Sequence, residues 1–349
     1  MPKIRLLIID DSLFFRTFLA SKISRDPSIE IVGSIGDPSE AVGRIGTIRP
    51  DVIAVDMEMP KMRGNEFLRN VLPKHPYVKA VVLSSLSGNV FDAMQAGAID
   101  FVGKPGSRPG YDEEQFIQDF LQKIKVAATA HTRAIPDRTH NKPAMRPVVP
   151  PMRTSVAGAT AKSIIAIGAS TGGTEAIIEV IKRFPANTPG VVIVQHMPPV
   201  FTRMYAERAD KICAMSVSEA QNGDRVKRGV ILLAPGGDQQ MYLRQDAAGY
   251  YVHLKHGEKV SGHCPSVDVL FDSVATTAGQ YAVGVLLTGM GADGAKGLTK
   301  MKNAGAHTIG QDEESCVVYG MPMVAYNMGG VSEQLPLTSI GDAVLRRFS

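Results

Sequence analysis

The sequence predicts an α/β protein with two doubly wound parallel-sheet domains. Short runs of aliphatic and β-branched residues without polar alternation, at 51–55, 164–167 and 191–194, are typical of strands buried on both faces of a parallel sheet. Segments with apolar residues at helical spacing alternate with these runs, as in a chain of βαβ units. The length of 349 residues suggests about two domains, and a hydrophobic content of 44% is ample for two cores.

The first half alternates five predicted strands with five predicted helices. The strands are expected at 3–9, 29–35, 51–55, 80–83 and 99–102. The first helix is expected to turn its aromatic and aliphatic residues inward, namely Phe14, Phe15, Phe18, Leu19 and Ile23. The other helices are expected at 41–48, 65–72, 90–95 and 113–130. Right-handed crossovers then bring the carboxyl ends of all five strands to one edge of the sheet.

Polar side chains gather at that edge. The strands end in Asp10, Asp11, Asp56, Ser84 and Lys104. Three carboxylates repel one another unless a hard cation joins them, and Mg²⁺ prefers oxygen ligands. A carboxylate can attack phosphorus, while a lysine and a hydroxyl hold the phosphoryl oxygens. The alternative is an acidic cluster without a ligand, which five polar residues at the ends of four strands disfavour.

A nucleophile motif opens the second half. Gly168-Ala-Ser170-Thr-Gly172 follows the buried run 164–167 and precedes a helical pattern that starts at 174. This spacing matches the nucleophile elbow, in which small neighbours leave a serine hydroxyl exposed above the sheet edge. The same glycine-rich turn could instead cradle a phosphate at a helix N-terminus.

A base and an acid are predicted at the same edge. His196 follows the buried run 191–194, and Asp293 follows the run 282–287. Alone, each is more often a structural residue. Because functional residues cluster at the carboxyl ends of strands in open α/β sheets, Ser170, His196 and Asp293 together indicate a catalytic triad.

The remaining elements of the second half are less regular. A strand is expected at 229–234, a hairpin strand at 250–254 and a short strand at 307–310. Helices are expected at 267–278 and 298–303, and a loop with a short strand at 312–322.

Charge and composition exclude several classes of protein. Residues 123–160 carry seven Lys and Arg against the single acid Asp137, so the pI of 8.8 reflects this segment alone. The proline-rich part, 131–160, reads as a solvated tether between domains; a weak contact with an acidic partner is less favoured. No apolar run reaches the roughly 18 residues of a membrane span, and no signal peptide is recognisable. Three scattered cysteines suit reduced thiols in the cytoplasm.

Residues 1–122 resemble a two-component receiver domain, which has a flavodoxin-like fold. The resemblance implies that Asp56 is the phospho-acceptor. It also implies Mg²⁺ as the cofactor of phosphorylation, held by Asp10, Asp11, Asp56 and the backbone carbonyl of Glu58.

The same resemblance assigns the phosphoryl-binding residues. Ser84 and Lys104 would bind the phosphoryl group, and Phe101 takes the position of the switch aromatic. The loop 59–64 departs from the family, because receivers usually carry Asp where this chain has Arg63. The departure bears on local contacts of the loop and not on the chemistry.

Residues 161–349 resemble the catalytic domain of chemotaxis protein-glutamate methylesterases, the CheB family, which implies a Rossmann-like α/β hydrolase fold. The matching stretches are 167–174, 195–198, 265–271, 287–295 and 315–322. One departure is Cys264, where the family usually has Arg. The resemblance further implies that the backbone N–H of Met290 binds the oxyanion and that hydrolysis needs no cofactor.

With domains at 1–122 and 161–349 joined by the segment 123–160, the chain is expected to be a phosphorylation-activated methylesterase of chemotaxis receptors that also deamidates selected glutamines. A chemotaxis histidine kinase would be the phosphodonor. We expect a cytoplasmic monomer that binds no nucleic acid and does not insert into membranes. The competing hypotheses are a nucleotide-dependent output domain and a non-enzymatic, phosphorylation-gated binding module; a DNA-binding regulator is disfavoured because the output half is α/β throughout.

Overall fold

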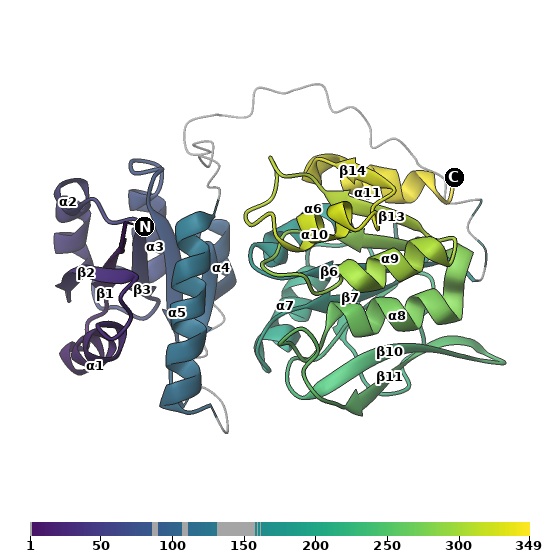
Figure 1. Ribbon diagram of the computed structural model, residues 1–349, viewed down its shortest axis with the longest axis horizontal. Helices are drawn as coiled ribbons and strands as arrows, with labels where there is room; N and C mark the ends of the chain where they lie inside the picture. Colours follow the sequence, from purple (N-terminus) through teal and green to yellow (C-terminus); the bar gives the residue numbers. More distant parts are fainter. Residues whose placement is uncertain (1, 86–89, 107–110, 131–157, 159, 161) are drawn as a thin grey trace. The chain divides into compact units, whose positions relative to one another are not determined.

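The structure is a computed structural model that describes residues 2–85, 90–106, 111–130, 158, 160 and 162–349. The chain divides into two compact units, Met1–Pro147 and Val148–Ser349 (Figure 1). Nearly all of the predicted tether, 131–160, lies outside the described residues. Within the described part, no helix combines the length and apolarity needed to cross a bilayer.

The first unit is built on a parallel sheet with strand order β2-β1-β3-β4-β5 among the described residues. Its strands are β1 (Ile4–Ile9), β2 (Ile29–Ile35), β3 (Val52–Asp56), β4 (Lys79–Ser84) and β5 (Asp100–Gly103). Its helices are α1 (Leu13–Ile23), α2 (Pro38–Ile48), α3 (Gly64–Val71), α4 (Val90–Gln95) and α5 (Glu113–Thr129). The predicted alternation of strands and helices is confirmed, and β3 is buried along its whole length.

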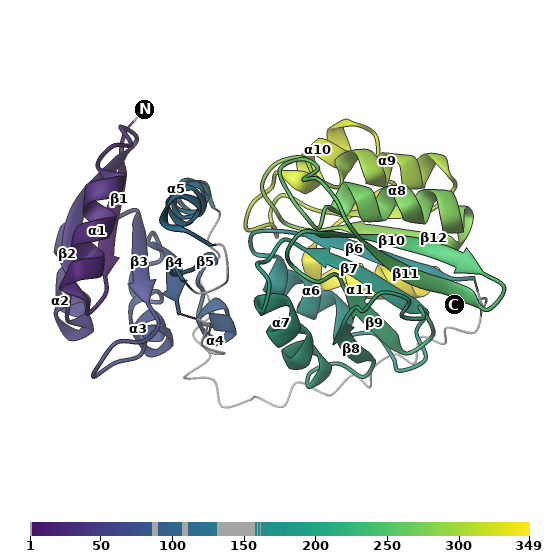
Figure 2. The same ribbon diagram turned by 90° about the horizontal axis from the view of Figure 1, so that it is seen from below.

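Helices cover both faces of this sheet. Helices α1 and α5 pack on one face, and α2, α3 and α4 on the other (Figure 2). The α1–α5 contact is aromatic, with the rings of Phe15 and Phe116 5.9 Å apart. The prediction that Phe14 points inward is wrong, because its side chain is 83% exposed. Leu19 and Ile23 are buried at helical spacing, and Phe14 lies off that face.

The second unit holds a larger parallel sheet, with order β14-β13-β12-β6-β7-β9-β8 in the described chain. Its strands are β6 (Ile164–Ala169), β7 (Gly190–Gln195), β8 (Ser216–Glu219), β9 (Val230–Leu233), β12 (Ala282–Leu286), β13 (His307–Gln311) and β14 (Glu333–Leu335). A separate antiparallel hairpin consists of β10 (Gln239–Asp246) and β11 (Gly249–His256). Strand β6 lies between β7 and β12, so the strand order reverses direction at β6. Ligands of open α/β sheets bind at such a reversal, outside the carboxyl ends of the strands.

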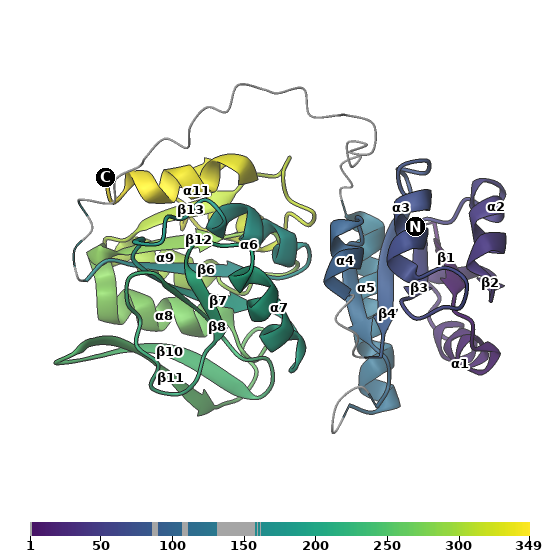
Figure 3. The ribbon, with the colours of Figure 1, turned by 180° about the vertical axis from the view of Figure 1, so that it is seen from behind.

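Two helical layers enclose the second sheet. Helices α8 (Val267–Ala278), α9 (Ala295–Asn303) and α10 (Met321–Asn327) lie on one face. Figure 3 shows α6 (Gly173–Ile181), α7 (Phe201–Asp210) and α11 (Leu337–Arg346) on the other. The hairpin packs against α8, and together they extend the apolar core beyond the sheet. The predicted fold class is confirmed in both units.

One predicted element of the second unit is wrong. The stretch 312–322 contains no strand, only an isolated bridge between Gly289 and Tyr319 and the start of α10. The backbone N–H of Val318 does not pair with a strand. It donates to the side chain of Thr288, at 2.9 Å from Oγ1. The sequence also leaves β8, β10, β14, α7, α10 and α11 unpredicted.

Arg63 leaves the start of α3 without a side-chain cap. It is the N-cap residue of α3, and its side chain makes no capping hydrogen bond. The side chain of Asn65 accepts from Glu66 N at 2.8 Å, and the carbonyl of Arg63 accepts from Phe67 N, but the guanidinium of Arg63 can accept no hydrogen bond from the first N–H groups of the helix.

An acceptor at this position should stabilise α3. We predict that Arg63→Asp protects the first turn of α3 by about 1 kcal/mol relative to Arg63→Ala, which slows amide exchange about fivefold. Hydrogen-exchange mass spectrometry on peptides that cover α3 in the full chain measures this. Equal exchange in the two variants would contradict the capping argument.

Candidate active site

Ser170 stands at the turn between β6 and α6, and glycine neighbours shape this turn. Gly172 is the N-cap of α6 with φ of 77°, a conformation that favours glycine. A Cβ on Gly168 would lie 2.2 Å from Val267 Cγ1, and one on Gly172 would lie 2.6 Å from Val317 Cβ. The small residues of the motif therefore allow two other segments to approach the elbow. Within the described residues, the Ser170 hydroxyl makes no hydrogen bond, so it remains available for chemistry.

His196 stands at the neighbouring strand end. Ala169 and Gln195 are paired in the β6–β7 ladder, and His196 N donates to Ala169 O at 3.1 Å. Gln195 is buried, and its Nε2 donates to Ser170 O at 2.9 Å and to His196 O at 3.2 Å. One buried amide thus links the backbones that carry the predicted nucleophile and the predicted base. The sequence analysis did not single out Gln195.

Asp293 receives hydrogen bonds at both carboxylate oxygens. His196 Nε2 lies 2.8 Å from Oδ2, and Val267 N donates to the same oxygen at 2.8 Å. Ser266 Oγ donates to Oδ1 at 2.7 Å, and Asp268 N at 3.0 Å. Burial raises the pKa of Asp293, but the hydrogen bonds and charge of His196 and the bond from Ser266 outweigh it, so the pKa lies below its usual value. Asp293 is therefore ionised near neutral pH.

The ionised carboxylate fixes the tautomer of His196. A carboxylate only accepts hydrogen bonds, so the proton must lie on His196 Nε2. This leaves Nδ1 unprotonated in the neutral ring, and Nδ1 is buried without a hydrogen-bond partner among the described residues. The arrangement can therefore remove a proton through Nδ1, on the ring edge that Asp293 does not occupy.

Ser266 was missed by the sequence analysis, although its position before a helical pattern is a typical capping signal. It is the N-cap of α8, and its side chain accepts from Val269 N at 3.4 Å while donating to Asp293. The start of α8 is thus fixed to the acid of the site. Met290, predicted to bind an oxyanion through its N–H, follows Gly289 in the loop after β12, and no described residue accepts a hydrogen bond from that N–H.

The predicted acidic residues of the first unit lie together at its sheet edge. Ligand oxygens of Asp10, Asp11 and Asp56 all lie within 4.8 Å of one another. Asp10 and Asp56 are buried, and Asp56 Oδ1 has no hydrogen-bond partner in the described part of the chain. Burial raises the pKa of Asp56 despite the opposing charge of Lys104. An unpaired buried oxygen beside two further carboxylates suits a hard divalent cation, so this donor set fits Mg²⁺.

Lys104 partly balances this charge. Its Nζ lies 2.8 Å from Asp10 Oδ2 and 2.9 Å from Asp56 Oδ2. Burial lowers the pKa of Lys104, but its hydrogen bond to Asp10 and the two carboxylate charges raise it above its usual value. Ser84 is fully buried at the end of β4, and Phe101 is buried with its ring 6.3 Å from that of Phe91.

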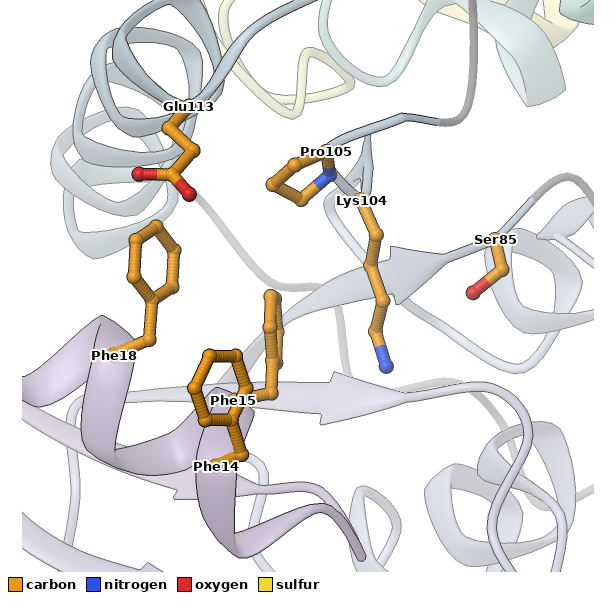
Figure 4. A pocket seen from close by; sticks show the side chains of 7 residues that line it. All are labelled: Phe14, Phe15, Phe18, Ser85, Lys104, Pro105 and Glu113. Carbon is orange, nitrogen blue, oxygen red and sulfur yellow. The ribbon is translucent and has the colours of Figure 1, made fainter.

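A pocket of about 250 Å³ adjoins Lys104 (Figure 4). The rings of Phe14, Phe15 and Phe18 on α1 form its aromatic wall, and Lys104 Nζ lies 4.7 Å from the centre of the Phe15 ring. Ser85, Pro105 and Glu113 complete the lining. The acidic cluster is therefore flanked by an aromatic surface rather than by charged groups alone.

Comparison with known proteins decides the family. The model of the CheB methylesterase family matches residues 165–344, and that of the response regulator receiver domain matches residues 6–111. The chain belongs to the CheB methylesterase family. It is 52% identical to a protein-glutamate methylesterase/protein-glutamine glutaminase of Syntrophomonas wolfei, over 99% of this chain and 98% of the relative. A protein of the same name from Syntrophotalea carbinolica is 47% identical, over 100% and 99%.

The solved structures agree with this membership. The crystal structure of the Thermotoga maritima CheB methylesterase catalytic domain is 36% identical and matches with a TM-score of 0.52. The match covers 53% of this chain and 98% of that domain. The family predicted from the sequence is therefore confirmed, whereas the individual site residues remain predictions.

In this member of the CheB family, Cys264 makes a contact within its own loop. Cys264 Sγ donates to Gly257 O at 3.8 Å, within the loop between β11 and α8. Burial raises the pKa of the thiol, so it stays protonated near neutral pH. The thiol of Cys264 therefore links the end of this loop to its beginning at Gly257.

The close approach of Gly289 to Ser170 gives a test of the elbow geometry. A Cβ on Gly289 would lie 2.7 Å from Ser170 Cβ and 2.3 Å from Met321 Sδ. We predict that Gly289→Ala displaces Ser170 and slows its labelling by a fluorophosphonate probe roughly 100-fold.

A matched control uses the same strand and loop region. Gly284→Ala in β12 would crowd Leu298 and Met301 instead, with contacts of 2.9 Å in the core. It should cost stability but leave the labelling rate of the folded protein within a few-fold of wild type. Unchanged labelling of Gly289→Ala would contradict the predicted displacement of Ser170.

Proposed function

We propose that this chain hydrolyses methyl esters of glutamate side chains with Ser170 as nucleophile, His196 as base and Asp293 as the residue that orients the base. The observation that carries the proposal is the hydrogen bond between His196 Nε2 and the ionised Asp293, which leaves Nδ1 buried and unpaired among the described residues, at the strand end beside Ser170. A base without a partner next to a free serine hydroxyl is the arrangement that nucleophilic catalysis needs.

The reaction follows from these roles. His196 Nδ1 takes the proton of Ser170 as Oγ attacks the ester carbonyl, and it returns the proton to the departing methanol. Water then attacks the acyl-enzyme, again deprotonated by Nδ1, and the glutamate carboxylate is released. Asp293 stabilises the imidazolium in both steps. The backbone N–H of Met290 binds the oxyanion, and losing such a donor typically costs about 3–4 kcal/mol.

The substrate assignment rests on the relatives. Full-length relatives are named protein-glutamate methylesterase/protein-glutamine glutaminase, and we extend both activities to this chain. In the second activity the same acyl-enzyme forms from a glutamine side chain, with ammonia as the leaving group. The substrates are methyl-accepting chemotaxis receptors, and the protein acts as a cytoplasmic enzyme of sensory adaptation.

The triad gives the first test. We predict that Ser170→Ala abolishes methanol release from methylated receptors while the protein stays folded, because the nucleophile is lost. Ser218→Ala, an exposed serine on β8, is the control and should retain wild-type turnover. Methanol release by Ser170→Ala at the wild-type rate would refute the assignment. Tight nucleotide binding that ignores Ser170→Ala would favour the nucleotide hypothesis, and receptor binding without methanol release would favour the binding module.

The receiver is proposed to control the hydrolase. Asp56 accepts a phosphoryl group from a chemotaxis histidine kinase, and Ser84 and Lys104 bind its oxygens. Asp10, Asp11, Asp56 and the carbonyl of Glu58 would hold Mg²⁺, which when bound offsets the negative charge of the carboxylates and the phosphoryl group. Movement of Ser84 toward the phosphoryl group lets Phe101 repack, which changes the surface of the receiver.

Control is by occlusion in this proposal: the unphosphorylated receiver blocks the hydrolase until Asp56 is modified. Deletion of residues 1–135 should therefore raise basal methanol release, by about 5- to 150-fold for a typical coupling free energy of 1–3 kcal/mol. Asp56→Asn should keep the basal rate of the full chain and lose its response to a small-molecule phosphodonor. If the truncated protein is no faster than the full chain, occlusion is wrong.

A further inference from the structure

A second imidazole lies flat on the predicted base. The rings of His196 and His263 are stacked with centroids 3.7 Å apart and planes inclined by 9°. His263 comes from the loop between β11 and α8, far from His196 in sequence. No motif used in the sequence analysis includes it.

The loop that carries His263 is held by its own hydrogen bonds. Val260 and His263 exchange backbone hydrogen bonds, Val260 N to His263 O at 2.9 Å and His263 N to Val260 O at 3.0 Å. The two residues between them, Ser261 and Gly262, both have positive φ, of 53° and 85°. This is the pattern of a tight two-residue turn, so the backbone of His263 is well defined.

Gln240 on the hairpin fixes both ends of this loop. Its Nε2 donates to Glu258 O at 2.9 Å, and its Oε1 accepts from Ser266 N at 2.7 Å. Gln240 is 1% exposed, so these bonds form away from solvent. Ser266 in turn donates to Asp293. One buried side chain therefore sets the positions of His263 and of the residue that holds the acid of the site.

Stacking restrains the tilt of the His196 ring, which its hydrogen bond to Asp293 leaves free. A hydrogen bond at Nε2 fixes one point of the ring, but the ring can still tilt about that point, because the χ2 well of histidine is broad. A parallel ring at van der Waals distance removes this tilt. The direction of Nδ1, which lies in the ring plane, is then determined.

The same geometry excludes a proton relay between the two histidines. Ring N–H groups and lone pairs lie in the planes of their rings, and the two planes are parallel. The contact between the rings is therefore between their π faces, and no ring N–H of one points at a ring nitrogen of the other. The stacked geometry lets His263 act on His196 through the position of that ring and through the π face that it offers to the imidazolium.

We infer that His263 is a positioning residue that aims Nδ1 of His196 at Ser170, an assignment that rests on the proposed triad. Loss of the flat ring should lower kcat and leave KM for the receptor almost unchanged.

The test compares two replacements in the full chain. His263→Phe keeps a flat aromatic ring, and His263→Leu fills similar space without one. We expect kcat of His263→Leu to fall at least tenfold and that of His263→Phe to stay within about threefold of wild type, since misplaced catalytic groups cost up to about 100-fold. Rates are divided by the concentration of Ser170 that a fluorophosphonate probe can titrate, so a loss of folded protein does not count.

A second readout does not depend on turnover. NMR of ¹⁵N-labelled histidine reports the tautomer and mobility of the His196 ring, and we expect a single Nε2–H form in wild type and His263→Phe and broadened or mixed signals in His263→Leu. Equal kcat and equal His196 signals in all three proteins would overturn the inference. If wild type releases no methanol, the proposed function fails, and the NMR comparison still decides whether His263 orients His196.

Discussion

The buried carboxylate of Asp293 is the constraint on which the second unit depends. Four donors from two segments converge on it: the ring of His196 after β7, and the hydroxyl of Ser266 with the first two amides of α8. A buried charge without such partners would cost several kcal/mol. The start of α8, the end of β7 and the loop after β12 must therefore be in place together. Because one buried charge must be satisfied, His196 and Asp293, the predicted base and acid, are held together.

Each unit buries an aspartate, and the surroundings shift the pKa values of the two carboxyl groups in opposite directions. Both bury an aspartate at the carboxyl edge of a parallel sheet, yet the pKa of Asp293 is lowered and that of Asp56 is raised. Asp293 has donors at both oxygens, whereas Asp56 keeps Oδ1 unpaired within the described residues. The first arrangement is stable as it stands and suits a residue that only orients. The second is poised to gain from an added cation and suits a residue that reacts.

The sequence was sufficient to predict those elements whose residue pattern has a single common structural cause. Apolar runs without alternation placed the sheets, because few other local structures produce that pattern. The glycines around Ser170 placed the turn between β6 and α6, although they left its chemistry open. Contacts between distant segments were not predictable in this way. Nothing in the local pattern shows that Gln240 reaches Ser266, or that His263 stacks on His196, since both depend on how the hairpin packs on α8. Phe14 was misplaced because aromatic residues on neighbouring helical positions cannot all face the core.

The hydrogen bonds of Gln240, which connect the hairpin to the loop of His263 and to Ser266, have a consequence for heat inactivation. The hairpin shares no ladder with the central sheet among the described strands; outside its own pairing it is bonded through β11 to residues 223–226 and packs on α8. Loosening of the hairpin would therefore break no ladder of the central sheet. Once Gln240 withdraws, the turn at 260–263 and the N-cap of α8 lose their shared support. Turnover would then stop at a lower temperature than global melting, and cooling would restore it without refolding of the sheet.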